Sequence, residues 1–458
     1  MAKTDTKRFY RRVFTIMIPV LLQNGITNFV NMLDNLMVGR VGTAEMTGVS
    51  VSGQLIFVFA LCIFGAVSGA GIFGAQFYGK GDEEGVRQTF RFKLLVTTVI
   101  AAGACVLFAF AGDPIADLFL RGEGDPSIAA ASAEAAHDYL TIMLVSLLPF
   151  AWTQCWSSTL RETDRTVLPM VSGFVAMAVN LGLNYVLIFG HFGAPALGVK
   201  GAAIATVVSR FVELLVVAVY SRITADKSPF LRGVFRTFRI PGKLALSILA
   251  RGFPLMLNET LWAAGLTTLN RYYSTRGLDV VAANNVNITF FNVFSVAFLS
   301  VGLSVGIILG QMLGAGEADE ARAAARRLMK FGIAVSIVVG ASYAAISGVV
   351  PHLYNTTDAV KATATGLMLI CAASMPFESI ANVEYFTLRS GGQALITFAF
   401  DSGFVWVFSV PTVILLATFT DVSVFTLYGA VQILNVLKCL VGYLFIRSGR
   451  WAKNIVNN

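Results

Sequence analysis

Three carboxylic acids lie inside long apolar stretches of this sequence, where their side chains could bind a cation. They are Asp34, Glu259 and Glu378. A charged carboxylate at the middle of a bilayer costs roughly 2.5–3.5 kcal/mol on insertion scales, so an acid at such a depth normally binds an ion or a substrate. The alternative is an uncharged carboxyl group that only forms a hydrogen bond between helices. The three acids therefore indicate reversible binding of an ion or a substrate.

Amide and hydroxyl side chains accompany the acids at helical spacing. Asn180 and Asn184 are an i, i+4 pair and lie on one face of a helix. Unpaired polar groups are costly in hydrocarbon, so a polar stripe indicates contact with water, a ligand or another helix. For the asparagines, hydrogen bonds that tie helices together explain the pattern equally well. The side chains that we expect to line a cavity are Gln23, Asn31, Trp262, Asn285, Asn292, Asn382 and Tyr385.

The composition requires membrane helices to carry these residues. Of 458 residues, 56% are hydrophobic and only 13% are charged, and this charged fraction is about half that of a soluble globular protein. Apolar stretches of about 20 residues, each long enough to cross a bilayer as a helix, recur along the chain. We predict an all-α polytopic membrane protein, which excludes a soluble enzyme. The twelve predicted transmembrane helices lie near residues 14–36, 50–77, 90–112, 138–159, 167–190, 197–220, 246–272, 284–312, 328–350, 362–387, 394–418 and 424–446.

The positive charges are distributed unevenly between the connections. Most of the 34 lysine and arginine residues lie in the N-terminus, the even-numbered connections and the C-terminus, while Arg210 and Lys438 fall inside predicted helices. By the positive-inside rule, both termini are cytoplasmic and the protein lies in the inner (plasma) membrane. The net charge of +8 therefore reflects membrane topology, and we expect no nucleic-acid partner.

The chain contains an internal repeat at an offset of 235 residues. The offset pairs Pro19 with Pro254 and Gly71 with Gly306, and it also pairs Gln76 with Gln311. We predict two six-helix lobes, 1–225 and 240–458, joined by a basic cytoplasmic linker, 226–239. Because both halves then start on the same side of the membrane, the repeat is parallel. Transporters built in this way usually bind the substrate between the halves, near the middle of the bilayer.

Motifs for nucleotide, metal or covalent chemistry are incomplete. GAQFYGKG has the spacing of a phosphate-binding loop, but Gly81 stands where the loop needs a serine or threonine for magnesium. The five cysteines and three histidines are scattered without the spacing of metal ligands. We therefore expect neither an enzyme nor a resident cofactor.

Four segments together resemble the multidrug and toxic compound extrusion (MATE) family over essentially the whole chain. The stretch IPVLLQNGITNFVNMLDNLMVGRVG is similar to the first helix of the family, with its acid at Asp34. The paired segments GAGIFGAQFYGKGD and VGIILGQMLGAGEAD resemble the ends of the second and eighth helices. NLGLNYVLIFGHFGAPALGVKGAAIAT, which begins at Asn180, resembles the fifth and sixth helices.

The resemblance implies twelve helices in two lobes around a cleft, and two sites for cations. Asp34 with Asn180, Asn184 and Thr206 would form the cation site of the N-terminal lobe. Several members of the family have Asp where this chain has Asn184, which leaves this site less charged. Glu259 and Glu378 would form an acidic pair in the C-terminal lobe, as in the branch that resembles NorM proteins. A sodium ion could bind in either lobe.

The resemblance also implies export of small organic cations or amphipathic drugs by alternating access. Inward movement of Na⁺ or H⁺ through the acids would drive the export, without another cofactor. We expect a monomer that needs only the lipid bilayer and its substrates. The main alternative is a flippase for lipid-linked or polysaccharide intermediates, which would need a cationic cavity. A membrane-embedded enzyme is the second alternative, and the spread of polar groups over both halves disfavours it.

Overall fold

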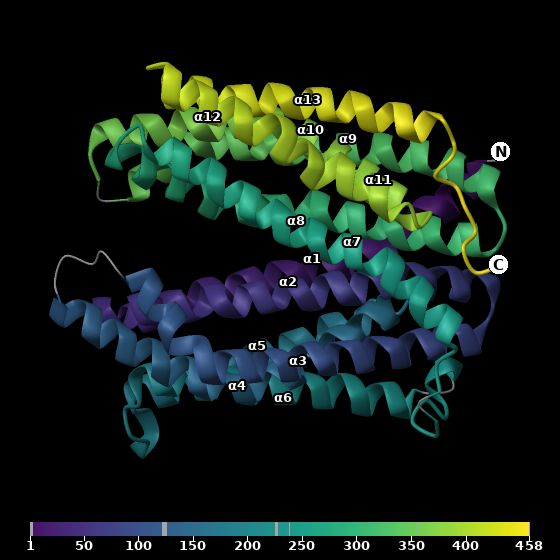
Figure 1. Ribbon diagram of the computed structural model, residues 1–458, viewed down its shortest axis with the longest axis horizontal. Helices are drawn as coiled ribbons and strands as arrows, with labels where there is room; N and C mark the ends of the chain where they lie inside the picture. The colour runs from purple at the N-terminus through teal and green to yellow at the C-terminus, as the bar shows by residue number, and fades with distance from the viewer. Residues whose placement is uncertain (1–2, 121–125, 225–227, 238, 355, 458) are drawn as a thin grey trace. The chain divides into compact units, whose positions relative to one another are not determined.

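The computed structural model describes residues 3–120, 126–224, 228–237, 239–354 and 356–457, and no strand occurs in these ranges. Most of the helices are long, with 23 to 38 residues (Figure 1). The helices are α1 (Lys3–Gly39), α2 (Thr43–Lys80), α3 (Glu83–Leu120), α4 (Pro126–Glu162), α5 (Val167–Phe189), α6 (Gly198–Ile223), α7 (Gly242–Ser274), α8 (Leu278–Gly314), α9 (Ala318–Ser347), α10 (Asp358–Ser390), α11 (Ala394–Phe398), α12 (Val410–Phe419) and α13 (Val424–Arg447).

The described part of the chain contains eleven helical segments that are long and apolar enough to cross a membrane. One of them, Ala394–Phe419, combines α11 and α12 with the π-helical stretches Ala399–Gly403 and Val405–Ser409. Helix α7 has 33 residues, but it is not among the eleven, and it carries Asn258 and Glu259 near its middle. With α7, the structure supplies the twelve predicted membrane segments, and the all-α membrane fold is confirmed.

The two halves of the chain repeat the same local features. Pro19 lies inside α1 and Pro254 inside α7, the first helix of each half. Gly81 and Gly316, which the repeat also pairs, follow α2 and α8 with φ angles of 78° and 85°. Glycine adopts this left-handed conformation without a steric penalty, so both helices end in the same way.

The residues form two compact units. Unit 1 comprises Met1–Leu21, Ala75–Asp82 and Ala250–Asn458, and unit 2 comprises Leu22–Gly74 and Glu83–Leu249. The predicted lobe boundaries, 1–225 and 240–458, stay a prediction.

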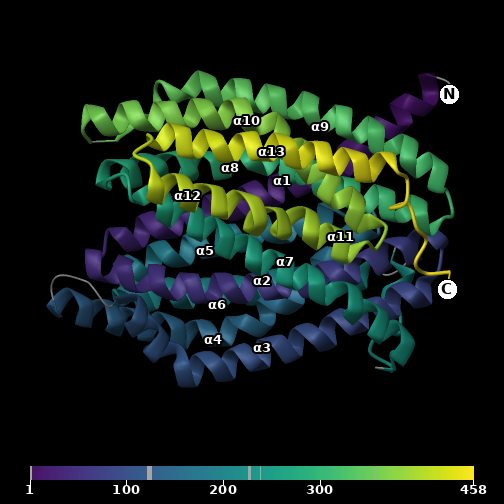
Figure 2. The same ribbon diagram turned by 45° about the horizontal axis from the view of Figure 1, so that its top comes forward.

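Each unit has its own apolar core. In unit 1, α10 packs against α8, α9 and α13, and Figure 2 shows these helices side by side. Its core includes Val305 of α8, Leu328 of α9 and Val383 of α10, all without solvent exposure. In unit 2, α4 packs against α3 and α6, and Leu160 and Phe90 belong to the core. Polar side chains inside either unit are therefore surrounded by closely packed hydrocarbon.

Candidate functional site

In unit 2, four predicted site residues form one chain of hydrogen bonds. The Nδ2 atom of Asn184 donates to Asp34 Oδ1 at 2.5 Å and to Asn180 Oδ1 at 3.2 Å. The Nδ2 atom of Asn180 is 3.4 Å from Thr206 Oγ1. The structure thus brings together residues from α1, α5 and α6 that lie as much as 172 positions apart, and their role in ion binding stays a prediction.

The two asparagines in the middle of this chain of hydrogen bonds are shielded from solvent, while Asp34 and Thr206 are partly exposed. Asn184 is 0% exposed and Asn180 is 2% exposed. The Oδ1 atom of Asn184 is buried and has no hydrogen-bond partner among the described residues. A buried carbonyl oxygen without a partner is energetically costly, and a bound cation or water next to Asp34 would satisfy it. The arrangement of a carboxylate, two amides and a hydroxyl offers oxygen ligands to a hard cation.

Two further side chains of unit 2 lie close to this chain of hydrogen bonds. Tyr139 of α4 is a hydrogen-bond partner of Thr206. The guanidinium of Arg210 interacts electrostatically with both Asp34 and Tyr139, and its Cζ atom lies 4.6 Å from the centroid of the Phe150 ring. In the sequence, Arg210 stands out only as a charge inside a predicted membrane helix. That unusual position was the one sign in the sequence that Arg210 lies near the site.

Gln23 lies in unit 2 with a partner that the sequence did not suggest. Its side chain is 9% exposed, and its Oε1 atom accepts a hydrogen bond from Arg161 Nη1 at 3.2 Å. Asn31, another predicted lining residue, has a side chain that lies outside the part of the chain that the structure describes. Of the two α1 residues, only Gln23 can therefore be placed.

In unit 1, the two predicted acids are held by different partners. Glu259 Oε1 accepts a hydrogen bond from the Tyr385 hydroxyl at 2.7 Å. Glu378 Oε1 accepts one from Asn435 Nδ2, also at 2.7 Å. The predicted lining residue Tyr385 is therefore next to Glu259, and each acid is oriented by a neutral donor from another helix.

A third acid, Asp401, interacts electrostatically with both Glu259 and Glu378, and sequence reasoning did not identify it. Its Oδ1 atom is 2.6 Å from Lys438 Nζ, and its Oδ2 atom accepts a hydrogen bond from Asn258 Nδ2 at 2.9 Å. The acidic site of unit 1 therefore contains a buried ion pair. The available signal was the position of Lys438 inside a predicted helix.

The π-helical stretch Ala399–Gly403 carries Asp401 and joins it to α7. The Ser402 hydroxyl donates to the Asn258 carbonyl at 2.6 Å and also lies 2.8 Å from Asn258 Oδ1. The backbone nitrogen of Ser402 donates to the same Oδ1 atom at 3.1 Å. A π-helical turn changes the direction of the side chains that follow it and is frequent at functional sites. The contacts with Asn258 fix this direction.

The other predicted lining residues lie on α7, α8 and α10. Asn285 and Asn292 are exposed on α8, and Trp262 is 37% exposed on α7. The amide oxygen of Asn382 packs against Gly302 of α8 and has no hydrogen-bond partner among the described residues. A cavity lined by these four residues stays a prediction.

Buried charges also occur away from the predicted sites. Lys93 Nζ in unit 2 is 2.6 Å and 2.7 Å from the two carboxylate oxygens of Glu162, and it also donates to Ser158 and Thr159. Such a pair has all its donors satisfied and ties α3 to α4. Within the described residues, no group of three or more His, Cys, Asp or Glu side chains could hold a metal ion.

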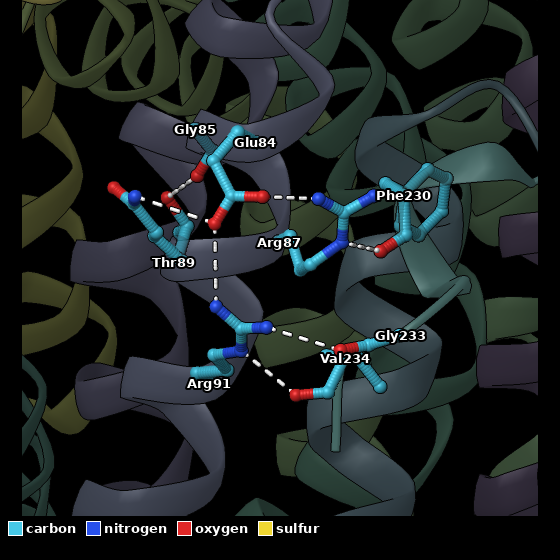
Figure 3. A network of polar contacts seen from close by, with 9 residues as sticks. Glu84, Gly85, Arg87, Thr89, Arg91, Phe230, Gly233 and Val234 are labelled. Carbon is cyan, nitrogen blue, oxygen red and sulfur yellow. Dashed lines mark hydrogen bonds and ion pairs between the residues drawn. The ribbon is translucent and has the colours of Figure 1, made fainter. Parts of the chain in front are cut away.

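The residues after α6 are also held by charged side chains, as Figure 3 shows. Arg91 Nε donates to the carbonyl of Val234 at 2.7 Å, and Arg87 Nε donates to the carbonyl of Phe230 at 3.0 Å. Both arginines also pair with Glu84 at the start of α3. These arginines thus fix the linker to α3, which agrees with a structural rather than a chemical role.

Known proteins resemble this chain over nearly its whole length. The family model described as MatE matches residues 19–186 and 254–417. The probable multidrug resistance protein YoeA of Bacillus subtilis is 26% identical to this chain, and the match covers 92% of this chain and 90% of the length of YoeA. The probable multidrug resistance protein NorM of Thermotoga maritima is 22% identical over 100% of this chain and 96% of its own.

Solved structures share the fold. A MATE transporter of Vibrio cholerae, VcmN with a D35N substitution, superimposes with a TM-score of 0.86 at 18% identity and covers 97% of this chain and 98% of its own. An outward-facing multidrug resistance MATE transporter of the MOP superfamily gives a TM-score of 0.84 at 17% identity, with 95% of each chain covered. Because the family model matches well over half of the sequence in two segments, one in each half, the chain belongs to the MatE family, the multidrug and toxic compound extrusion family that its motifs predict.

Proposed function

We propose that this protein is an antiporter that exports organic cations and other drugs in exchange for Na⁺ or H⁺. The observation that carries the proposal is the partly buried chain of hydrogen bonds from Asp34 through Asn184 and Asn180 to Thr206. Its oxygens suit a small cation, and apolar helices surround it. The names of the relatives, which are multidrug resistance proteins, support the choice of drugs as substrates.

Exchange of the drug for the ion at Asp34 would couple export of the drug to entry of the ion. A cation that binds this carboxylate neutralises it, so the site holds an organic cation less tightly in the same state. A ligand shifts a conformational equilibrium only by its different affinities for the two states. Export therefore requires that the ion favour one of the two access states. Sodium would use Asn184 Oδ1 as a further ligand, whereas a proton would need only the carboxylate.

Gradient-driven transport by reconstituted protein tests the proposal. Inside-out proteoliposomes would receive an organic-cation dye under an imposed proton gradient and, separately, a sodium gradient. We expect dye uptake by the wild type under one of them, and at least a tenfold loss for Asp34→Asn, which keeps the shape but removes the exchangeable charge. Asp358→Asn is the matched control, because the side chain of Asp358 is 98% exposed. Full uptake by a folded Asp34→Asn protein would refute the assignment.

Glu259→Gln in the same assay tests whether unit 1 also couples. A loss of uptake would show that Glu259 takes part in coupling. It would also support a role for Glu378, because Asp401 interacts with both glutamates. Failure of the wild type to move the dye under either gradient would favour the flippase for lipid-linked intermediates. Chemical change of a labelled substrate would instead favour an enzyme.

Topology and assembly belong to the same proposal. We infer that both termini are cytoplasmic, because lysine and arginine concentrate in one set of connections. We also propose that the protein acts as a monomer in the plasma membrane. Protease accessibility of a terminal tag in sealed, right-side-out vesicles tests the orientation. Cleavage from outside would contradict it.

A further inference from the structure

Lys438 is a buried cation among the acids of unit 1. Its side chain is 10% exposed, and its Nζ atom lies 2.6 Å from Asp401 Oδ1 and 5.1 Å from the centroid of the Phe400 ring. The ammonium also interacts electrostatically with Glu378 and Glu384. Burying a charge is costly unless it is paired, so this lysine has its partners fixed by the fold.

Glu384 is the second unusual group in this cluster. It is 0% exposed, and neither of its carboxylate oxygens has a hydrogen-bond partner among the described residues. It faces α13 at Gly442, which lies one helical turn after Lys438. A side chain at Gly442 would occupy the position of the Glu384 carboxyl group. The close approach of α10 and α13 thus directs this acid toward the face of α13 that carries Lys438.

We propose that Lys438 serves as a tethered cation that takes the place of a free sodium ion in unit 1. Four acids of unit 1, Glu259, Glu378, Glu384 and Asp401, interact with two cations, Lys438 and Arg389. An excess of acids over cations is the electrostatic condition for attracting a further cation from water. The ammonium of Lys438 already supplies a cation to these acids through its ion pair with Asp401. A free sodium ion is therefore excluded from the cluster.

Unit 2 differs in this respect. The carboxylate of Asp34 is hydrogen-bonded to the neutral amide of Asn184. The guanidinium of Arg210 interacts with Asp34 electrostatically, but its ion pair is with Glu213, at 3.7 Å. Free ions would therefore exchange at Asp34, and unit 1 would carry a permanent counter-charge. This division rests on the proposed function, but the binding property of unit 1 does not depend on transport.

Neutralising Lys438 should turn the cluster into a sodium site. Sodium could then be bound by the Asp401 carboxylate, by the amide oxygens of Asn258 or Asn435, and by water. Oxygen ligands of these kinds suit hard cations. A glutamine at position 438 keeps much of the side-chain volume and adds one more amide oxygen.

Equilibrium binding of ²²Na⁺ to purified protein in detergent tests the proposal. All variants carry Asp34→Asn, which removes the site of unit 2. We expect no saturable sodium binding to Asp34→Asn alone, one saturable site after adding Lys438→Gln, and its loss when Asp401→Asn is added as well. Lys438→Arg, which keeps the charge, is the matched control and should bind no sodium.

Two outcomes would overturn the proposal. One is saturable sodium binding to the Asp34→Asn protein, if adding Asp401→Asn or Glu378→Gln abolishes that binding. Lys438 would then not exclude the ion from unit 1. The other is no binding to a folded protein that carries Asp34→Asn and Lys438→Gln. If that protein does not fold, Glu384→Gln is added, because it replaces a buried carboxyl group that has no hydrogen-bond partner among the described residues, and the same two criteria apply. Failure of dye transport with the expected binding pattern would refute the proposed function alone.

Discussion

Glu384 shows, at the scale of single residues, how the fold sets the properties of a carboxyl group. Four acids of unit 1 lie in the same membrane region. Glu259, Glu378 and Asp401 each accept a hydrogen bond, whereas Glu384 has no hydrogen-bond partner within the described residues. A buried polar group without partners lowers stability, and its replacement by a neutral group of the same shape costs little.

Glu384→Gln should therefore lower the free energy of unfolding by less than the roughly 1–3 kcal/mol that the loss of a buried hydrogen-bond partner costs, because it removes no hydrogen bond that the structure shows. Thermal melting in detergent measures this. Gly442→Ala is the informative comparison, because its methyl group would overlap Glu384 and should cost about 1–3 kcal/mol by overpacking. A large loss of stability in Glu384→Gln itself would mean that the carboxylate is charged and paired with Lys438.

The residues of the candidate site could be predicted in part. Asp34, Asn180 and Asn184 stand out because helical spacing and an apolar context are visible in the sequence. Asp401 does not stand out as readily, because its place in the cluster depends on a π-helical stretch that breaks the ordinary spacing. Its pairing with Lys438 joins two helices, and local sequence patterns contain no information about such packing.

The ends of α2 and α8 illustrate the scale of helices. Within unit 1, Gly314 packs directly against the carbonyl group of Gln76, and Gly79 packs against the carbonyl group of Gln311. The repeat pairs Gln76 with Gln311 and Gly79 with Gly314, so the two contacts are equivalent. The helices can approach this closely because neither crossing position carries a side chain.

Gly314→Ala should lower stability strongly, because the new methyl group would fall far inside van der Waals contact with the Gln76 backbone. We expect a loss of at least 1–3 kcal/mol, about the cost of overpacking a core. Gly182→Ala in α5 is the control, since a methyl group there meets nothing within 4 Å, and alanine favours a helix by about 1 kcal/mol. Equal melting temperatures of the two variants would contradict the close crossing.

The number and order of the membrane segments were largely predictable from hydropathy, but several boundaries were wrong: α4 begins at Pro126 and not near 138, and α9 begins at Ala318 and not near 328. The predicted segment 394–418 agrees closely with the observed span Ala394–Phe419. What hydropathy does not reveal is the irregular backbone inside this span. The π-helical stretches depend on tertiary contacts, such as those of Ser402 with Asn258.

At the scale of the whole molecule, the two halves fasten their last segments in similar ways. Arg87 of α3 holds the carbonyl of Phe230 after α6. Arg322 of α9, its partner in the repeat, donates to the carbonyl of Gly449 after α13 at 3.3 Å. The duplication visible in the sequence thus extends to contacts with the segments that follow α6 and α13. The segment after α13 then continues along unit 1, where Asn454 Nδ2 donates to the carbonyl of Leu313 at 2.9 Å.

Trp451 anchors this segment and is 2% exposed. Its Nε1 atom donates to the carbonyl of Ile446 at 3.2 Å. Trp451→Ala should cost about 3–5 kcal/mol, as expected for removing a buried tryptophan. Thermal melting measures the loss, and Phe192→Ala is the control, because Phe192 is 90% exposed. An unchanged melting temperature for Trp451→Ala would show that the segment contributes little to unit 1.

The contacts of Gln76 have a consequence for the time course of synthesis. Its side chain accepts a hydrogen bond from the backbone of Ile455, which is 379 residues later in the chain, and donates to the carbonyls of Ser390 and Lys453. At a translation rate of about 5–20 residues per second, Ile455 leaves the ribosome about 20–75 s after Gln76. During that interval, water or the insertion machinery must satisfy this amide. The end of α2 therefore reaches its final hydrogen bonds only when nearly all of this sequence has been translated.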